Sequence, residues 1–156
     1  MNYGRQPRWF SGQFLESQHL QYLTMHTESL LGAALTMVPQ EVYGFASLEM
    51  DTSLLQSGTL RLSSMAAITQ DGSLIRYPGN SRVPDLNFID QWRNPKEPLD
   101  IYIGIRRYSP SAPNVSDDSS GRSRLSAPME MLDYNDADRS VKIELLELDV
   151  RFFTSN

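Results

Sequence analysis

From residue 42 onward, apolar and polar residues alternate in short runs, and this period of two constrains the fold more than any other feature. Such runs, separated by turn-forming residues, predict half-buried β-strands. Asp71-Gly72 stands between the runs at 66–68 and 74–77 and is typical of a tight hairpin turn. Further strands are expected at 45–50, 59–63, 99–105 and 141–150, with 99–105 as a central strand. Roughly seven or eight short strands suit an antiparallel β-sandwich.

The N-terminal segment has a helical period instead. Its apolar residues at offsets of three and four are Leu20, Leu23, Leu30, Leu31 and Ala34. With Thr27 as the polar gap, this spacing predicts one helix at about 16–36 that carries these residues on one side. Gly32 weakens the helix near its end, and Val38-Pro39 forces the chain out of helical geometry. The expected fold class is therefore mainly β, an antiparallel β-sandwich with one N-terminal α-helix.

Two stretches in the C-terminal half depart from simple alternation. The apolar positions of 141–150 are odd through Leu145 and even from Leu146, which predicts a β-bulge that keeps both halves facing the core. The stretch 109–126 holds seven serines and two prolines, so it has almost nothing to bury and is expected to be a mobile surface loop. Residues 1–156 are expected to form a single domain, and the abrupt end after the last strand suggests the N-terminal fragment of a longer protein.

Composition excludes several classes of function. The chain has 14 basic and 19 acidic side chains and a formal net charge of −5, which argues against binding to nucleic acid. It has no cysteine, so disulfides and cysteine–zinc sites are excluded. No stretch of about 18 apolar residues is present, which argues against direct membrane insertion. A cytoplasmic domain without cofactors is expected.

No catalytic or metal-binding constellation stands out. His19 and His26 are seven residues apart on the predicted helix, about 10.5 Å along its axis, too far for one metal ion to bind both. Glu49 and Asp51 alternate onto one strand face, and a pair of carboxylates of this kind is a candidate for hydrolase chemistry. Most such pairs on strands are simply solvated. We therefore predict a protein that is not an enzyme, with no catalytic residues and no metal.

Three large aromatic residues, Trp9, Phe10 and Phe14, lie close to the N-terminus on a segment expected to be an extended arm with a turn at Ser11-Gly12. Local core packing is one interpretation of these residues. Large aromatics are also frequent anchors of protein interfaces, because each buries much area at small entropic cost. We name Trp9, Phe10 and Phe14 as candidate partner contacts. His19 completes the set, since a hydrogen bond from its side chain is expected to hold the junction between arm and helix.

The opening of the chain resembles the TssK family, the baseplate subunit of the bacterial type VI secretion system. That family typically begins Trp-x-x-Gly-Met-x-Leu-x-Pro-Gln-His-Phe-Gln, and Gln13, Ser17 and Leu20 depart from it. The residues that agree are Trp9, Gly12, Leu15, Gln18, His19 and Gln21. The resemblance continues, in order, through Tyr43-Gly44, Leu48–Asp51, Gly58, Asp71-Gly72, Tyr77-Pro78 and Ile101–Ile105.

The resemblance implies a fold, partners and a function. The N-terminal region of TssK is a β-sandwich similar to the shoulder domain of siphophage receptor-binding proteins, and the full-length proteins assemble as trimers. Their N-terminal side attaches to the baseplate wedge subunits TssF and TssG, and their C-terminal side docks onto the membrane complex. This chain is then a structural assembly module that links the wedge to the rest of the adaptor, by burial of apolar surface on its arm and helix.

Two other functions remain open at this stage. The first is a small-ligand or carbohydrate-binding β-sandwich, in which Tyr77, Trp92 and Tyr102 form a stacking platform. The second is a hydrolase that uses Glu49 and Asp51.

Overall fold

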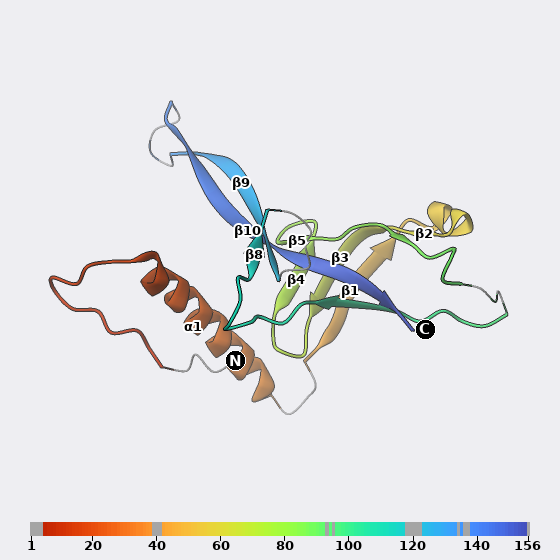
Figure 1. The fold of residues 1–156 in the computed structure, drawn as a ribbon, viewed down its shortest axis with the longest axis horizontal. Helices are drawn as coiled ribbons and strands as arrows, with labels where there is room; N and C mark the ends of the chain where they lie inside the picture. Colours follow the sequence, from red (N-terminus) through yellow and green to blue (C-terminus); the bar gives the residue numbers. More distant parts are fainter. Residues whose placement is uncertain are drawn as a thin grey trace. The chain divides into compact units, whose positions relative to one another are not determined.

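The computed structural model describes residues 5–38, 42–92, 94, 96–117, 123–133, 135 and 138–155 (Figure 1). These residues form a mainly β protein with one N-terminal α-helix, α1 (Ser17–Thr36), and one 3-10 helix, η1 (Thr52–Ser57). The strands are β1 (Gly44–Met50), β2 (Thr59–Leu60), β3 (Leu62–Ile68), β4 (Leu74–Tyr77), β5 (Ser81–Arg82), β6 (Leu86–Asn87), β7 (Ile101–Ile105), β8 (Val115–Ser116), β9 (Arg124–Leu132) and β10 (Ser140–Thr154). The chain divides into two compact units, Met1–Ala46 with Ala67–Leu74, and Ser47–Ala66 with Ile75–Asn156.

The expected fold class is confirmed: one helix precedes a set of mostly antiparallel strands. The helix predicted at 16–36 is α1, and Pro39, expected to end it, lies outside the described residues. Asp71-Gly72 forms the turn between β3 and β4, which are hydrogen-bonded neighbours, and Gly72 has the positive φ of 83° that this turn requires. The likeness to siphophage shoulder domains stays a prediction.

In the first unit, α1 packs on the β3–β4 turn through two glycines. A Cβ placed on Gly72 would lie 2.6 Å from the Cα of Gly32, and one placed on Gly32 would lie 3.0 Å from the carbonyl oxygen of Asp71. No side chain fits at Gly72, where the distance is 2.6 Å, and a side chain at Gly32 is crowded at 3.0 Å. Gly32 therefore gives up helix propensity for a close approach between the helix backbone and the turn.

The second unit is organised around β10, which pairs with three other strands. Its first half is antiparallel to β9, residues Leu148 and Asp149 pair with β5 in parallel, and its last five residues are antiparallel to β7. The buried apolar side chains of this unit are Leu60, Leu62, Met65, Ile75, Phe88, Leu125, Leu148 and Val150. Among them lies one buried carboxylate, Asp149, whose Oδ2 accepts hydrogen bonds from Nε and an Nη of Arg151 at 2.9 and 2.7 Å.

Two details of the predicted strands are wrong. The β9–β10 register runs from Ser140↔Leu132 to Leu148↔Arg124 without a break, so no bulge lies between Leu145 and Leu146. Both of these side chains are exposed, and without a bulge they lie on opposite faces of the strand. β7 is not central, because β10 is its one strand partner among the described residues.

Part of the serine-rich stretch 109–126 has regular structure. β8 pairs in parallel with the first residues of β9, and Ser123 is buried. Asn114 closes the preceding turn, since its Oδ1 accepts from the N–H of Ser109 and its Nδ2 donates to the carbonyl of Ser109, both at 2.7 Å. Residues 118–122 of the predicted loop lie outside the described residues.

We expect Gly32→Ala to destabilise the protein. In an exposed helix this change stabilises by about 1 kcal/mol. Here the new methyl group meets the Asp71 carbonyl oxygen, and overpacking of this kind costs about 1–3 kcal/mol. Urea unfolding measures the change, with Thr27→Ala on an exposed position of the same helix as the control. A stabilisation by Gly32→Ala as large as that of the control contradicts the close packing.

Candidate partner-binding surface

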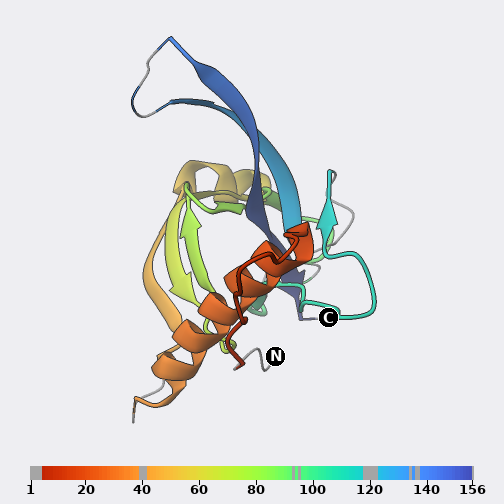
Figure 2. The same ribbon diagram turned by 90° about the vertical axis from the view of Figure 1, so that its left-hand side faces the viewer.

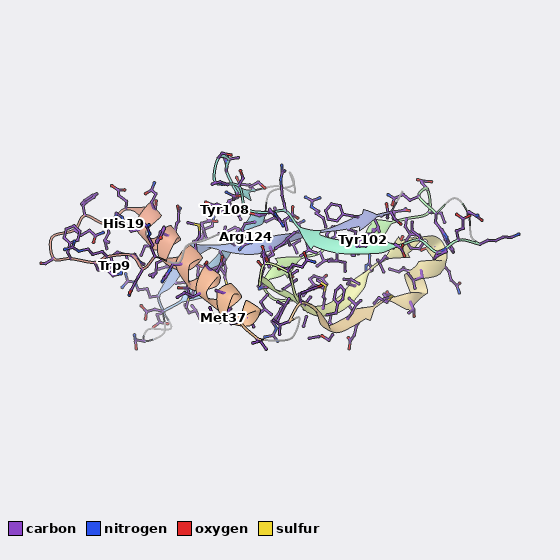
Figure 3. All side chains as sticks on the ribbon, turned by 90° about the horizontal axis from the view of Figure 1, so that it is seen from below. Trp9, His19, Met37, Tyr102, Tyr108 and Arg124 are labelled. Atoms are coloured by element: carbon purple, nitrogen blue, oxygen red, sulfur yellow. The ribbon has the colours of Figure 1, made fainter. Side chains whose placement is uncertain are left out.

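The aromatic arm, residues 5–16, displays its rings rather than burying them. Trp9, Phe10 and Phe14 are 45, 59 and 81% exposed. The Trp9 ring lies 6.3 Å from the ring of His19, and Figure 3 shows the two side chains close together at the start of α1. The guanidinium of Arg8 lies 5.9 Å from the centre of the Phe10 ring. Local core packing, one interpretation of the sequence, does not describe these rings.

Hydrogen bonds attach the arm to the helix. The Nδ1 atom of His19 accepts from the backbone N–H of Glu16 at 3.1 Å, and the His19 N–H donates to the Glu16 carbonyl at 3.0 Å. This is the side-chain hydrogen bond expected at the junction of arm and helix. Farther along, the Tyr22 hydroxyl donates to the carbonyl of Arg5 at 2.9 Å. A turn at Ser11-Gly12, with a φ of 82° at Gly12, lies between these two attachments.

The apolar residues of α1 are exposed as well. Gly32 is buried and marks the side of the helix that packs on the β3–β4 turn. Leu23 precedes Gly32 by nine residues, about two and a half turns at 3.6 residues per turn, so it lies on the opposite side. We call this exposed side the α1 stripe; its large apolar members are Leu20, Leu23, Leu30 and Leu31. The sequence placed these residues on one side of a helix. The clue that this side faces outward is Gly32, a small residue that permits close packing and lies across the helix from Leu23.

The candidate stacking platform does not form. The Trp92 ring packs against Phe88 at 6.2 Å, and its Nε1 donates to the Glu97 carbonyl at 2.8 Å. Tyr102 projects from β7 and is exposed (Figure 3). No ring contact joins Tyr77, Trp92 and Tyr102 in the part of the chain that the structure describes.

The carboxylate pair is not arranged for acid–base chemistry. The Asp51 carboxylate accepts hydrogen bonds from the hydroxyl and the backbone N–H of Ser53, at 2.6 and 3.0 Å, and so caps the N-terminus of η1. The Ser53 hydroxyl, more than any other group, lowers the pKa of Asp51 below its usual value. A general acid requires a shift in the opposite direction. Glu49 is exposed on β1.

Other features of the surface add no reactive site. A shallow hollow of about 380 Å³ lies beside Pro128, Met129, Glu130 and Lys142 and contains none of the predicted site residues. Over the described ranges, no group of three or more histidine, aspartate or glutamate side chains is placed to hold a metal ion. No described helix has the length and apolar character needed to cross a membrane.

Comparison with known proteins identifies the family. Residues 19–156 match the model of a family of bacterial type VI secretion proteins known as EvfL, ImpJ and VasE. The chain belongs to this family. It is also 27% identical over 106 residues to the type VI secretion baseplate component TssK1 of Pseudomonas aeruginosa, an alignment that covers 67% of this chain and 23% of TssK1. The chain therefore spans about a quarter of the length of that relative.

Solved TssK structures share the fold of this family member. A crystal structure of TssK matches 97% of the chain, and 34% of its own length, with a TM-score of 0.84 at 20% identity. The TssK-TssF-TssG baseplate subcomplex, determined by cryo-electron microscopy, contains a chain that matches 97% of this one, and 51% of its own length, with a TM-score of 0.82 at 18% identity. The TssK-like character predicted from the N-terminal motif is thus confirmed.

We expect Asp51→Ala to lower the thermal unfolding midpoint at neutral pH, because η1 loses its cap. The pKa of Asp51 is lowered in the folded state, so its contribution to stability is present above the usual value of 3.8 and is lost as the pH falls through the folded-state pKa. The difference between variant and wild type should shrink below about pH 3.8. Glu49→Ala, at an exposed position two residues earlier, is the control. A difference that does not depend on pH contradicts this role of the carboxylate.

Proposed function

We propose that this chain is a structural assembly module of a type VI secretion baseplate, which links the baseplate wedge to the rest of an adaptor protein. Its partners are wedge subunits of the TssF and TssG type, and it acts in the cytoplasm. Self-association as a trimer in the full-length protein belongs to the same proposal. The observation that carries it is an aromatic arm whose rings are exposed while its backbone is fastened to a helix.

Exposed but ordered aromatics suit a docking role. Trp, Tyr and Arg are the side chains that most often supply the binding energy of interfaces, because they bury a large area and lose little rotamer entropy. The bonds from Glu16 to His19 and from Tyr22 to Arg5 hold the arm before any partner arrives. Binding then has to order fewer groups, so more of the energy of burial appears as affinity. We assign Trp9, Phe10 and Phe14 as partner contacts and His19 as the residue that positions them.

The total exposed area supports a chain that is covered by neighbours. Its accessible surface is 11991 Å². A compact protein of 17.7 kDa exposes about 8,000 Å², and two separate compact bodies of half that mass expose about 9,600 Å² together. The excess over both figures includes the exposed rings of the arm and the leucines of the α1 stripe, which add apolar surface. A specific interface needs about 800 Å² from each partner, an area that the arm and the stripe together can contribute.

Replacing Trp9 and Phe14 tests the proposal. We expect Trp9→Ala and Phe14→Ala each to weaken co-purification with TssF- and TssG-type subunits by about thirtyfold, the change that corresponds to about 2 kcal/mol at an interface hot spot. Tyr102→Ala, which removes from the second unit an aromatic ring whose exposure lies between those of Trp9 and Phe14, is the matched control and should bind as the wild type does.

Circular dichroism establishes that each variant is folded. Undiminished capture of the wedge subunits by folded Trp9→Ala and Phe14→Ala would reject the arm as the docking surface. Equal losses in the Tyr102→Ala control would do the same, because the effect would not be specific to the arm.

A further inference from the structure

β1 lies at one edge of the three-stranded sheet β1-β3-β4 and is shown in tan in Figure 2. All seven of its residues, Gly44–Met50, are exposed. Among the described strands, β3 is its one hydrogen-bonded neighbour. The backbone groups on the other side of β1 therefore form an open edge, to which a further strand can add.

The hydrogen bond that follows β1 shows which of its groups face outward. The N–H of Asp51 donates at 2.9 Å to the carbonyl of Arg61, the residue before β3, so this N–H points toward β3. In a regular strand, successive residues direct their N–H and C=O groups to alternate sides. The backbone groups of Ala46, Leu48 and Met50 therefore point away from β3 and make up the open edge.

Other strand edges are closed or covered. On β4, at the opposite edge of the same sheet, the N–H of Arg76 donates to Oδ1 of Asn80 at 2.7 Å. The carbonyl of Arg76 accepts from the N–H of Asn80 at 3.0 Å and from the hydroxyl of Ser81 at 2.8 Å. The turn after β4 thus satisfies outward groups that another strand would need. β7, whose one described strand partner is β10, is exposed only at Tyr102.

β1 lacks the usual features that keep strands from adding to an edge. Natural edges are protected by proline, by lysine, by a β-bulge or by a covering segment. Residues 44–50 include no proline and no basic residue, and Glu49 is their one charged residue. Phe45, Leu48 and Met50 are 54, 38 and 41% exposed, so an added strand also covers apolar area on both faces of β1.

We propose that the open edge of β1 binds an extended segment of a wedge subunit, which joins the sheet as an additional strand. The backbone groups of the edge specify this kind of occupant, because an extended chain supplies a matching donor and acceptor at every second residue. Main-chain hydrogen bonds then hold the segment, and its alternate side chains provide specificity.

The side chains of β1 indicate which segment fits. Leu48 and Met50 lie on one face of β1, so we expect apolar residues on that face of the added strand. Phe45 and Glu49 lie on the other face. Cross-strand neighbours of opposite charge stabilise a pair of strands, so we expect lysine or arginine opposite Glu49. The segment is therefore apolar on one face and carries a basic residue on the other.

This inference rests on the proposed function, because it takes the partner to be a wedge subunit. It adds a contact that differs in kind from the arm. The arm offers aromatic side chains, whereas β1 offers backbone donors and acceptors. An experiment can therefore lose one contact and keep the other.

Hydrogen exchange, measured at single residues, tests strand addition directly. In the free chain the amides of Ala46, Leu48 and Met50 should exchange rapidly, whereas those of Ser47 and Glu49, which face β3, should be protected. We expect bound TssF- and TssG-type subunits to slow the three outward amides by about tenfold or more and to leave the two inward amides nearly unchanged. A partner that merely covers one face of β1 does not produce this alternation.

Replacing Leu48 provides a second measurement. Proline at this position removes the outward N–H in the middle of the edge and leaves the groups that pair with β3 in place. We expect Leu48→Pro to weaken capture of the wedge subunits by about tenfold, the loss that corresponds to about one hydrogen bond. Leu48→Ala, which shortens the side chain but keeps the N–H, is the matched control and should weaken capture less.

Each other result overturns the inference in a distinguishable way. If the wedge subunits bind while exchange at Ala46, Leu48 and Met50 is unchanged, the proposed function stands and β1 is not the contact. Equal slowing at outward and inward amides indicates a covered face rather than an added strand. Slowing that grows with the concentration of the chain alone assigns the edge to a second copy.

A complete failure to capture wedge subunits rejects the inference together with the proposed function. Circular dichroism establishes whether Leu48→Pro is folded. If it is not, the exchange of the wild-type chain decides alone, because that measurement requires no substitution.

Discussion

The backbone hydrogen-bond ladder along β10 is the interaction on which the second unit depends. This strand bonds to β9, β5 and β7 in succession, and its residues 148–150 are buried. The ladder carries Asp149, which is 2% exposed, into the interior. A buried carboxylate is costly unless it is paired. Arg151, two residues later on the same side of the strand, supplies the partner, and Ser123 accepts the hydrogen bond of the Asp149 N–H at 3.2 Å.

Local chemistry explains why much of the fold was predictable. Asp71-Gly72 needs a positive φ that glycine supplies, so the hairpin between β3 and β4 could be located from two residues. The helix followed from leucine spacing and ended close to the expected position. The bulge in β10 was predicted wrongly because a change of parity has two physical origins. An extra residue is one, and a regular strand with apolar residues on both faces is the other, as at Leu145 and Leu146, which lie on opposite faces and are both exposed. A single sequence does not distinguish them.

The candidate site was predictable in its parts but not in its arrangement. The hydrogen bond at His19 followed from its position at the junction of arm and helix. Whether Trp9 and Phe14 were buried could not be read from composition, because exposure depends on what the rest of the chain places beside them. The same holds for the α1 stripe. Its leucines have the pattern of a core-facing helix, and it is the contact between Gly32 and Gly72 on the other side that leaves them outside.

Pro128 protects the two-stranded ribbon of β9 and the first half of β10, residues 126–132 and 140–146, from pairing with further strands. An exposed apolar strip on extended strands is the kind of element from which endless fibres grow, one strand adding to the next along an open edge. The missing donor on β9 makes its outer edge a poor template for another strand. The carboxylates and the ammonium group on one face of the ribbon keep that face polar. The ribbon can therefore stay exposed in water without adding strand after strand at its edge.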